Sequence, residues 1–205
     1  CPGHSSEPSS TGQGASPGTT TGRGGGPASS AAPTATSLPT SHAYVVSTAC
    51  RKPASSVGSG LALPHSKPAP FTGTQTDCGG SLDFSSYTSG KPTLVTFFAS
   101  WCEPCHQEAK DLEALYEKYH VSKGFQVIGV DTQDESGSPS WFYTDAKWSF
   151  PSVWDDGEKI EKAWNQSGAT STLPASFWIH PDGTISSIDA GAMSRSQIED
   201  EFNKL

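Results

Sequence analysis

Apolar side chains are distributed unevenly along this 205-residue chain. Residues 1–65 are dominated by Gly, Ser, Thr, Pro and Ala, whereas all six Trp residues and most of the Phe and Tyr follow Pro70. A segment with so little apolar area cannot offset the conformational entropy that is lost on ordering. We therefore predict a disordered, partly extended tether over residues 1–65 and a single folded domain over residues 66–205.

Within the predicted domain, two apolar runs flank a region of helical periodicity. The run KPTLVTFFAS, residues 91–100, is rich in β-branched and aromatic side chains and predicts a strand buried on both faces. From Pro104 to Tyr119 apolar residues recur every three or four positions, which predicts an amphipathic helix with proline in its first turn. The run FQVIGVD, residues 125–131, predicts a second buried strand after a stop at Gly124. Strand, helix and strand in this order favour a right-handed parallel crossover.

The second half of the domain predicts shorter elements and an antiparallel pair of strands. SPSWFYTDAKW, residues 138–148, and EKIEKAWN, residues 158–165, have helical patterns. ASFWIHPDGTISSID, residues 175–189, predicts a hairpin around a Pro-Asp-Gly turn. Ser194 and Gln197 have the capping-box spacing of a last helix. The predicted fold is therefore an α/β mixed sheet with helices on both faces.

The net charge of the chain limits the classes of molecule that it is expected to bind. The formal net charge is −8, and the acidic excess lies entirely in residues 66–205. This balance argues against nucleic acid as a partner and against a polybasic contact with a membrane. The sequence also has no apolar run approaching about 18 residues, the length that predicts a transmembrane helix.

The number of cysteines, five, is odd, so one of them stays unpaired in an oxidising compartment. A chain that begins with Cys1 and continues as a long polar tether resembles a mature bacterial lipoprotein, in which that cysteine carries lipid; the alternative is an arbitrary starting point. Lipidation of Cys1 leaves an even four cysteines. Cys50 and Cys78 then predict a structural disulfide that closes a loop of about 29 residues. The alternative is two unrelated thiols, with Cys78 in the surface turn DCGG.

The remaining pair, Cys102 and Cys105, lies where the predicted strand passes into the predicted helix. At a helix N-terminus the unpaired N–H groups and the helix dipole lower the pKa of a thiol, so Cys102 is predicted to form the reactive thiolate. Cys105, one turn later, is placed to attack the mixed disulfide that Cys102 forms. A zinc site would need four ligands, and the sequence has no second C-x-x-C. A Cu(I) site with His180 as third ligand stays open as an alternative.

These motifs occur in an order that resembles a known family. WCEPC after a buried strand, TLPASFWI further along and the Pro-Asp-Gly hairpin beyond it are similar to the thioredoxin superfamily. Within it, about residues 68–205 resemble the TlpA and ResA type of membrane-anchored, DsbE-like thiol-disulfide oxidoreductase. The resemblance implies a thioredoxin-like fold, with Cys102 as the exposed nucleophile and Cys105 as the resolving thiol. It also implies that the peptide bond between Leu173 and Pro174 is cis and that these residues bind substrate.

Further residues near the pair acquire a predicted role from this resemblance. Ordinary thioredoxins carry a buried Asp at the position of Thr96, which cannot act as a base, whereas Glu108 coincides with the buried Glu of the ResA-like proteins. Glu108 is therefore expected to have a raised pKa and to exchange the proton of the second cysteine; the alternative is a solvated residue of the first helical turn. Trp101 is expected to cover the site and contact substrate, or simply to pack at the strand end. Glu103 puts a negative charge beside the first cysteine, which disfavours a strongly oxidising pair.

The predicted function is that of an extracytoplasmic protein, lipid-anchored to the outer face of the bacterial cell membrane, that reduces disulfides in exported proteins. Apocytochrome c is a frequent substrate in the family, and the resemblance implies regeneration by a membrane electron donor of the thiol-reducing type. We expect a monomer without a dissociable cofactor. Two alternatives stay open: an oxidase that installs disulfides with the same cysteines, and a non-enzymatic Cu(I) carrier or redox-sensing binding module.

Overall fold

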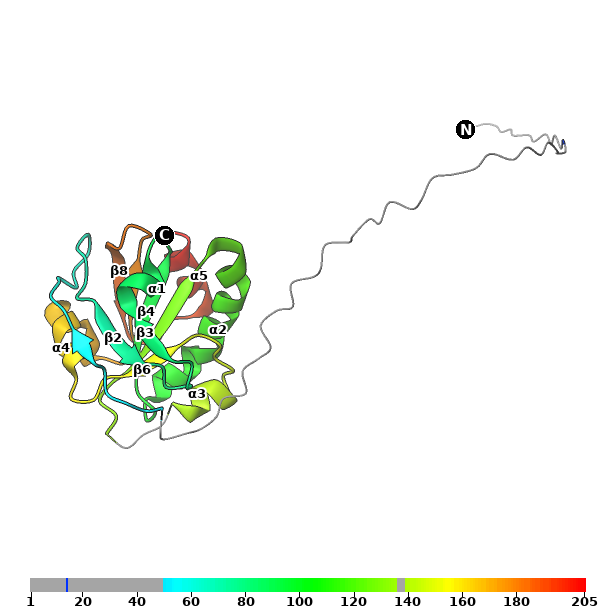
Figure 1. Ribbon diagram of the computed structural model, residues 1–205. Coiled ribbons are helices and arrows are strands. Elements are labelled where there is room, and N and C mark those ends of the chain that lie inside the picture. The colour runs from blue at the N-terminus through cyan, green and yellow to red at the C-terminus, as the bar shows by residue number, and fades with distance from the viewer. Residues whose placement is uncertain (1–13, 15–49, 136–138) are drawn as a thin grey trace, which may run out of the picture. The chain divides into compact units, whose positions relative to one another are not determined.

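The computed structural model describes residues 14, 50–135 and 139–205. Within these ranges the chain forms a five-stranded sheet, a three-stranded sheet and helices around them (Figure 1). The strands are β1 (Ser56–Val57), β2 (Phe71–Thr74), β3 (Ser81–Asp83), β4 (Thr93–Phe98), β5 (Gln126–Asp131), β6 (Ser152–Trp154), β7 (Ala175–Ile179) and β8 (Ile185–Ala190). The helices are α1 (Phe84–Thr88), α2 (Glu103–Lys123), α3 (Ser140–Thr144), α4 (Lys159–Trp164) and α5 (Arg195–Phe202), with 3₁₀ turns at Asn165–Ser167 and Ala169–Ser171.

The five-stranded sheet has the order β6-β5-β4-β7-β8 and places β4 at its centre. β4 pairs in parallel with β5 and antiparallel with β7, and β5 pairs in parallel with β6. All six residues of β4 are buried, as its continuous apolar run predicts. β7 and β8 form the predicted antiparallel hairpin. The mixed sheet and the parallel crossover from β4 through α2 to β5 are therefore confirmed.

The long helix α2 begins a few residues after β4 and ends at a glycine. Pro104 lies in its first turn, where the missing N–H would have had no partner within the helix. Gly124 ends the helix in the left-handed conformation, with φ of 68°, which a residue without Cβ adopts at little cost. The buried residues of α2 include Cys105, Glu108 and Leu112. The helix therefore presents the second cysteine and a carboxyl group to the interior.

Side chains alternate between the two faces of β4, so each face of the sheet has its own core. Leu94 and Phe98 belong to an apolar cluster with residues of α2, α3 and α5. Val95 and Phe97 belong to a second cluster with residues of the three-stranded sheet, α1 and α4. The second cluster also contains Trp164, which is fully buried. Helices therefore cover both faces of the sheet, as predicted.

The helix predicted over residues 138–148 is shorter in the structure, where α3 spans only Ser140–Thr144. The chain turns at Lys147, whose φ is 65°. Trp148 then donates its indole N–H to the Ala109 carbonyl of α2 at 2.9 Å. Tertiary contacts of this kind end the helix earlier than its local pattern predicts. The next predicted helix appears as α4, and the predicted capping box opens α5.

Residues 50–65, which the sequence assigns to the tether, contact the folded domain. β1 pairs antiparallel with β2, and the Ala54 N–H donates to the carbonyl of Trp154 in β6 at 2.9 Å. Ala54 and Ala62 are buried. The folded part therefore begins earlier than residue 66, because small side chains and backbone groups can pack against a sheet edge without the apolar pattern that marks a strand.

Residues 1–13 and 15–49 lie outside the described part of the chain, so the tether and the lipid on Cys1 stay predictions. In the ranges that the structure does describe, no helix combines the length and the apolar character needed to cross a membrane.

Cys50 and Cys78 form a disulfide, with their Cα atoms 5.1 Å apart. The bond joins the segment before β1 to the loop between β2 and β3. Cys78 lies in an exposed turn with φ of 67°, as the alternative for DCGG expected. Its sulfur is nevertheless bonded to Cys50, so the two cysteines are not unrelated thiols. The disulfide therefore ties the beginning of the folded part to the three-stranded sheet.

Removing the Cys50–Cys78 disulfide should destabilise the domain. The sequence separation of 28 closes a loop for which the loop-entropy relation gives about 3 to 4 kcal/mol. The double variant C50S/C78S should therefore unfold at a lower urea concentration than the parent protein, as followed by tryptophan fluorescence. A loss of stability below about 1 kcal/mol would contradict this and would point to an unfolded state that is already constrained.

Candidate active site

The cysteine pair lies at the junction of β4 and α2. Cys102 is the N-cap residue of α2, and its Sγ accepts a hydrogen bond from the Cys105 N–H at 3.2 Å. The two cysteines form a disulfide with Cα atoms 5.3 Å apart. The first sulfur therefore meets the unpaired N–H groups at the start of the helix, which stabilise a thiolate once the disulfide is reduced.

Exposure to solvent does not distinguish the two cysteines. The family resemblance implies an exposed Cys102, yet in this disulfide form Cys102 and Cys105 are each only 2 % exposed. Both belong to the apolar cluster that contains Phe98 and Ala99, and Leu173 packs against that cluster. Because each sulfur is bonded to the other, both stay within the cluster and the expected difference is absent. The helix N-terminus, and not accessibility, sets Cys102 apart.

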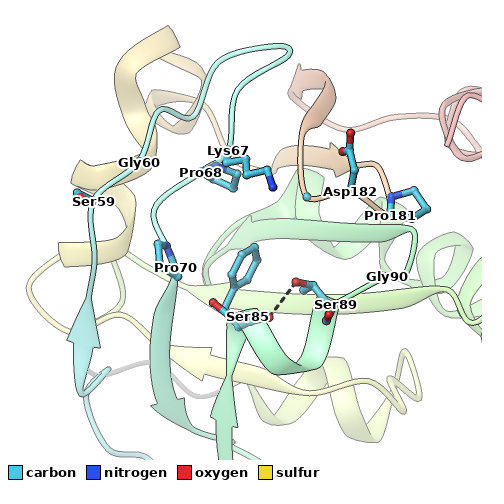
Figure 2. Close-up of a pocket in the computed structure, with 13 residues that line it drawn as sticks. Ser59, Gly60, Lys67, Pro68, Pro70, Ser85, Ser89, Gly90, Pro181 and Asp182 are labelled. Atoms are coloured by element: carbon cyan, nitrogen blue, oxygen red, sulfur yellow. Dashed lines mark hydrogen bonds between the residues drawn. The ribbon is translucent and has the colours of Figure 1, made fainter.

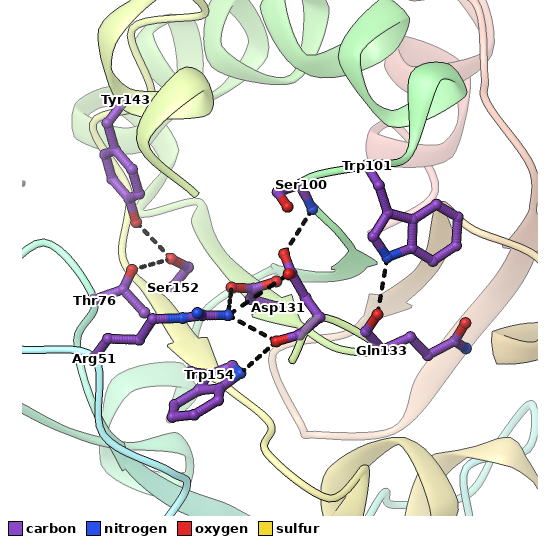
Figure 3. Close-up of polar contacts among 10 residues, drawn as sticks. Arg51, Thr76, Ser100, Trp101, Asp131, Gln133, Tyr143, Ser152 and Trp154 are labelled. Carbon is purple, nitrogen blue, oxygen red and sulfur yellow. Dashed lines mark hydrogen bonds and ion pairs between the residues drawn. The ribbon is translucent and has the colours of Figure 1, made fainter. Parts of the chain in front are cut away.

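The surface around the pair is formed by Trp101 and the loop before β7. Trp101 is 61 % exposed and donates its indole N–H to the Gln133 carbonyl at 2.8 Å (Figure 3). Its position is therefore fixed while much of its ring stays open to solvent, unlike a side chain that only packs at a strand end. The Leu173–Pro174 peptide bond is cis, as the resemblance implies. The antiparallel register of β7 with β4 places this bond at the carboxyl end of β4, the end that leads into the cysteine pair.

Glu108 lies one helical turn after Cys105 and is only 2 % exposed. Its Oε2 accepts a hydrogen bond from the Met193 N–H at 2.7 Å, whereas Oε1 is buried without a hydrogen-bond partner among the described residues. Burial raises the pKa of Glu108 to about 7; the Met193 N–H opposes this shift, and the charges of Asp189 and Asp111 add to it. The alternative of a solvated first-turn residue is therefore excluded, and Glu108 is a buried acid that titrates near neutral pH.

The other expected features of the site are also located. Thr96 is buried in β4, so the strand presents a neutral side chain at the position where ordinary thioredoxins carry an acid. Glu103 opens α2 with a side chain that is 77 % exposed and whose Oε2 lies 3.8 Å from Nδ1 of His106. A solvated negative charge therefore follows Cys102 directly.

Comparison with known proteins decides the family. Residues 65–188, more than half of the chain, match the AhpC/TSA family. The chain belongs to the AhpC/TSA family.

Relatives of known class agree with the geometry of the cysteine pair. The chain is 28 % identical over 127 residues to the thiol-disulfide oxidoreductase ResA of Bacillus subtilis, over 62 % of this chain and 68 % of that protein. Among solved structures, StoA from Bacillus subtilis matches with a TM-score of 0.52 and 25 % identity, over 65 % of this chain and 96 % of StoA. A secreted Mycobacterium tuberculosis disulfide oxidoreductase homologous to E. coli DsbE has the same fold, with a TM-score of 0.56, 24 % identity and coverage of 66 % and 96 %. This AhpC/TSA domain is therefore thioredoxin-like and of the ResA type of thiol-disulfide oxidoreductase.

The position of His180 removes the third ligand of the Cu(I) alternative. β7 runs antiparallel to β4, so His180, directly after β7, lies beyond Thr93 at the end of the sheet opposite the cysteine pair. The length of β4 separates the two sites by more than about 10 Å. Among the residues that the structure describes, no group of three or more His, Cys, Asp or Glu side chains is arranged to hold a metal ion. The Cu(I) alternative, in which His180 supplies the third ligand beside the cysteine pair, is therefore wrong.

A pocket of about 510 Å³ lies at this same far end of the AhpC/TSA domain (Figure 2). Its lining includes Gly90, which precedes β4, and Pro181–Gly183, which follow β7. Lys67 and Asp182 are its charged lining residues. Because β4 separates the pocket from the disulfide, the pocket takes no part in the cysteine site.

Sequence reasoning missed a polar network beside the cysteine loop (Figure 3). Arg51 contacts Asp131 and Asp134, and Asp134 Oδ2 accepts a hydrogen bond from the Ser100 N–H at 2.9 Å. The available signal was the run VDTQD, which puts two carboxylates at the end of a buried strand. No local pattern connects that run with an arginine 80 residues earlier.

Proposed function

We propose that this protein is an extracytoplasmic reductase of disulfides in exported proteins. The observation that carries the proposal is the Cys102–Cys105 disulfide at the N-terminus of α2, with the buried Glu108 one turn further along the same helix. A nucleophilic thiol, a resolving thiol and a proton acceptor therefore follow one another at spacings of three residues. This is the minimum set of groups that disulfide exchange needs.

The reaction begins from the reduced form of the pair. The Cys102 thiolate, stabilised by the helix N-terminus, attacks one sulfur of a substrate disulfide. A new sulfur–sulfur bond forms to Cys102, the substrate disulfide breaks, and the released substrate sulfur takes up a proton. The product of this step is a mixed disulfide between enzyme and substrate.

The second step releases the substrate. Cys105 loses its proton to the carboxylate form of Glu108 and attacks Cys102 Sγ. The intramolecular disulfide re-forms, the bond between Cys102 and the substrate breaks, and the second substrate sulfur takes up a proton as it leaves. Two electrons have then passed from the protein to the substrate. A pKa near 7 suits Glu108 for this role, because both its charged and its neutral form are populated near neutral pH.

Trp101 and Leu173–Pro174 form the proposed binding surface for the substrate chain. Among the described residues, the backbone N–H and C=O of Leu173 have no hydrogen-bond partner, whereas the Pro174 carbonyl accepts from the Gly191 N–H at 2.8 Å. An extended segment of substrate can pair with free backbone groups of this kind. The exposed Trp101 ring supplies apolar contact area beside it.

The reducing direction is supported by charge. Glu103 follows Cys102 directly, and a negative charge there opposes the thiolate and so disfavours the reduced form that a strong oxidant must stabilise. Regeneration of the dithiol is assigned to a membrane electron donor of the thiol-reducing class. Apocytochrome c, with its haem-attachment cysteines, is the proposed substrate class.

The proposed location is the outer face of the bacterial cell membrane, with Cys1 as the lipid anchor. The Cys50–Cys78 disulfide supports an oxidising compartment, since such bonds are rare where thiols are kept reduced. The related Mycobacterium tuberculosis protein is secreted. The protein is proposed to act as a monomer.

The equilibrium reduction potential of Cys102–Cys105 tests the proposal. It is measured against glutathione on the full chain with Cys1→Ser, so that lipid and the extra thiol do not interfere. A value below about −220 mV supports a reductase that a membrane donor keeps reduced. A value above about −150 mV would reverse the direction and make the protein an oxidase that forms disulfides. The absence of any reversible couple would exclude disulfide exchange.

A further inference from the structure

The segment that follows β5 holds the loop that carries the cysteine pair. Asp134 Oδ2 accepts a hydrogen bond from the Ser100 N–H at 2.9 Å. The Gln133 carbonyl accepts the indole N–H of Trp101 at 2.8 Å. Both positions immediately before Cys102 are therefore fixed by neighbouring residues of one short segment (Figure 3).

The same segment is held from its other side by Arg51. Its Nη2 donates to the Asp134 carbonyl at 2.8 Å and lies 3.5 Å from Asp131 Oδ2 and 3.8 Å from Asp134 Oδ1. The side chains of Asp131 and Asp134 are 0 % and 2 % exposed, and that of Arg51 is 15 % exposed. Two carboxyl groups this deeply buried repel each other when both are charged, and burial and the charge of Asp134 raise the pKa of Asp131 well above its ordinary value, whereas Arg51 opposes this shift. Within the described ranges, Arg51 is the cation that pairs with both of them.

Trp154 restricts where the guanidinium group can lie. The Arg51 Cζ stands 4.3 Å from the centre of the Trp154 ring, a favourable cation–π distance. The Trp154 indole N–H donates to the Asp134 carbonyl at 3.0 Å, the same oxygen that accepts from Arg51. The planar guanidinium is therefore held between an aromatic face and two carboxylates, an arrangement that a flexible ammonium group does not reproduce.

The Cys50–Cys78 disulfide fixes the backbone directly before Arg51. Arg51 directly follows Cys50, which is bonded to Cys78, and the backbone of Ala54 joins β6 through its hydrogen bond to Trp154. The chain is thus anchored on both sides of Arg51, at residue 50 and at residue 54. The backbone of Arg51 therefore loses less conformational freedom when its side chain binds the carboxyl groups than it would in an unanchored segment.

We propose that Arg51 is a positioning residue of the cysteine site, held in place by the Cys50–Cys78 disulfide. Through the segment of Gln133 and Asp134 it fixes Ser100 and Trp101, and so the surface on which a protein substrate docks. The inference rests on the proposed function in one respect, namely that Trp101 contacts substrate. The proposal gives the Cys50–Cys78 disulfide a role in substrate binding, in addition to the stability that it provides by closing a loop.

The proposed role of Arg51 predicts different effects on the reactions with protein disulfides and with small disulfides. A protein disulfide must dock on the Trp101 surface before it reacts, whereas a small aromatic disulfide needs little more than the Cys102 thiolate. The hydrogen bond from the Cys105 N–H to Cys102 Sγ is internal to α2 and does not involve Arg51. Loss of Arg51 should therefore reduce reaction with protein disulfides and leave reaction with small disulfides unchanged.

The first experiment compares hydrogen exchange at the Trp101 indole N–H by NMR in the full chain and in R51M. The expected result is an increase of about tenfold in the exchange rate, because the acceptor carbonyl of Gln133 is no longer held. K52M is the matched control, since Lys52 is the neighbouring cation and is exposed. Equal exchange in R51M and the parent protein, or the same increase in K52M, would overturn the proposal.

The second experiment measures kcat and KM for insulin reduction, together with the rate of reaction with 5,5′-dithiobis(2-nitrobenzoate). In R51M we expect kcat/KM for insulin to fall about tenfold, mainly through KM, with the rate for the small disulfide changed less than about twofold. A general loss of structure would reduce both rates together, and that outcome would also overturn the proposal.

Two further variants separate the role of Arg51 from a loss of stability and from the role of the disulfide. R51M leaves Asp131 and Asp134 buried without their cation, so R51M/D131N, in which a neutral amide replaces one of the two carboxyl groups, should fold more readily and show the same loss with insulin. C50S/C78S retains Arg51 and should increase exchange at the Trp101 indole in the same direction. Parental exchange in C50S/C78S would show that the disulfide has no part in positioning Arg51.

Failure of this inference and failure of the proposed function give different results. If the parent protein does not reduce insulin at all, the proposed function fails, and the exchange rates of the Trp101 indole still test the contact with Arg51. If the parent protein is active and R51M matches it in every measurement, only the role of Arg51 fails.

Discussion

Replacing Cys105 by serine should stop turnover and leave substrate protein covalently attached to Cys102. The Cys102 thiolate keeps its place at the N-cap of α2, so it still attacks a substrate disulfide. Serine cannot attack the resulting mixed disulfide, and the enzyme stops after one half-reaction. The rate of insulin reduction should fall by about a thousandfold or more. Mass spectrometry under non-reducing conditions should show the adduct.

The matched control is Cys102→Ser, which lacks the first nucleophile. It should be equally inactive and should form no adduct. The structure makes this comparison necessary, because both cysteines are buried to the same extent and exposure does not identify the nucleophile. An adduct on C102S and none on C105S would reverse the two roles. Undiminished turnover by C105S would exclude the two-step mechanism.

Replacing Glu108 by glutamine should slow the release of substrate and flatten its pH dependence. A carboxylate accepts the Cys105 proton, and glutamine cannot, so the resolving step should slow by about a hundredfold at neutral pH. In the parent protein the rate should rise as Glu108 loses its proton around pH 7, where burial has placed its pKa. Single-turnover kinetics of release from a preformed mixed disulfide, from pH 5.5 to 8.5, measure this directly.

The same substitution should stabilise the folded protein at alkaline pH. Burial raises the pKa of Glu108 from an ordinary value of 4.5 to about 7, so folding favours the protonated form. Below pH 4.5 the carboxyl is protonated in both states and contributes no difference. As the pH rises from about 4.5 to about 7, the unfolded state loses its proton first and the folded state becomes less stable. Above pH 7 the penalty is complete, about 3 kcal/mol.

Urea unfolding of E108Q and the parent protein at pH 4 and pH 8 checks this sign. We expect equal stability at pH 4 and a more stable variant at pH 8, by up to about 3 kcal/mol, because glutamine keeps an acceptor for the Met193 N–H. Glu113 also has its pKa raised by burial to about 7, but it is present in both proteins, so the difference reports on Glu108. A variant that is less stable at pH 8 would mean that the charged form of Glu108 is the favoured one in the folded state.

Local pattern was sufficient for the central part of the fold. The run over residues 91–100 predicted a strand buried on both faces, and β4 is that strand. The periodicity from Pro104 predicted a helix, and α2 runs from Glu103 to Lys123. These elements could be predicted because burial on both faces and amphipathic helix packing each leave a periodic signature in neighbouring residues.

Chemistry at the cysteine pair was also predictable in part. The spacing of Cys102 and Cys105 at a helix start indicated disulfide exchange, and the structure places Cys102 at the N-cap. Resemblance to a family pointed to Glu108 and to a cis bond before Pro174, features that no spacing could indicate. The buried carboxyl group of Glu108 accepts a hydrogen bond from Met193, which lies 85 residues further along the chain and could not be placed beside it from local pattern.

The sequence by itself determined the strand, helix and strand that became β4, α2 and β5, the β7–β8 hairpin, the mixed sheet and the cysteine motif, but it did not indicate β1, β2, β3, α1 or β6. Only the tertiary structure decided that residues 50–65 join the domain, that His180 lies at the far end of the sheet, and that Arg51 reaches the segment beside the cysteine loop. The physical reason is the range of the interactions. Strand and helix patterns come from contacts between near neighbours, whereas the position of Arg51 depends on strand register, a disulfide and packing between residues about 80 positions apart.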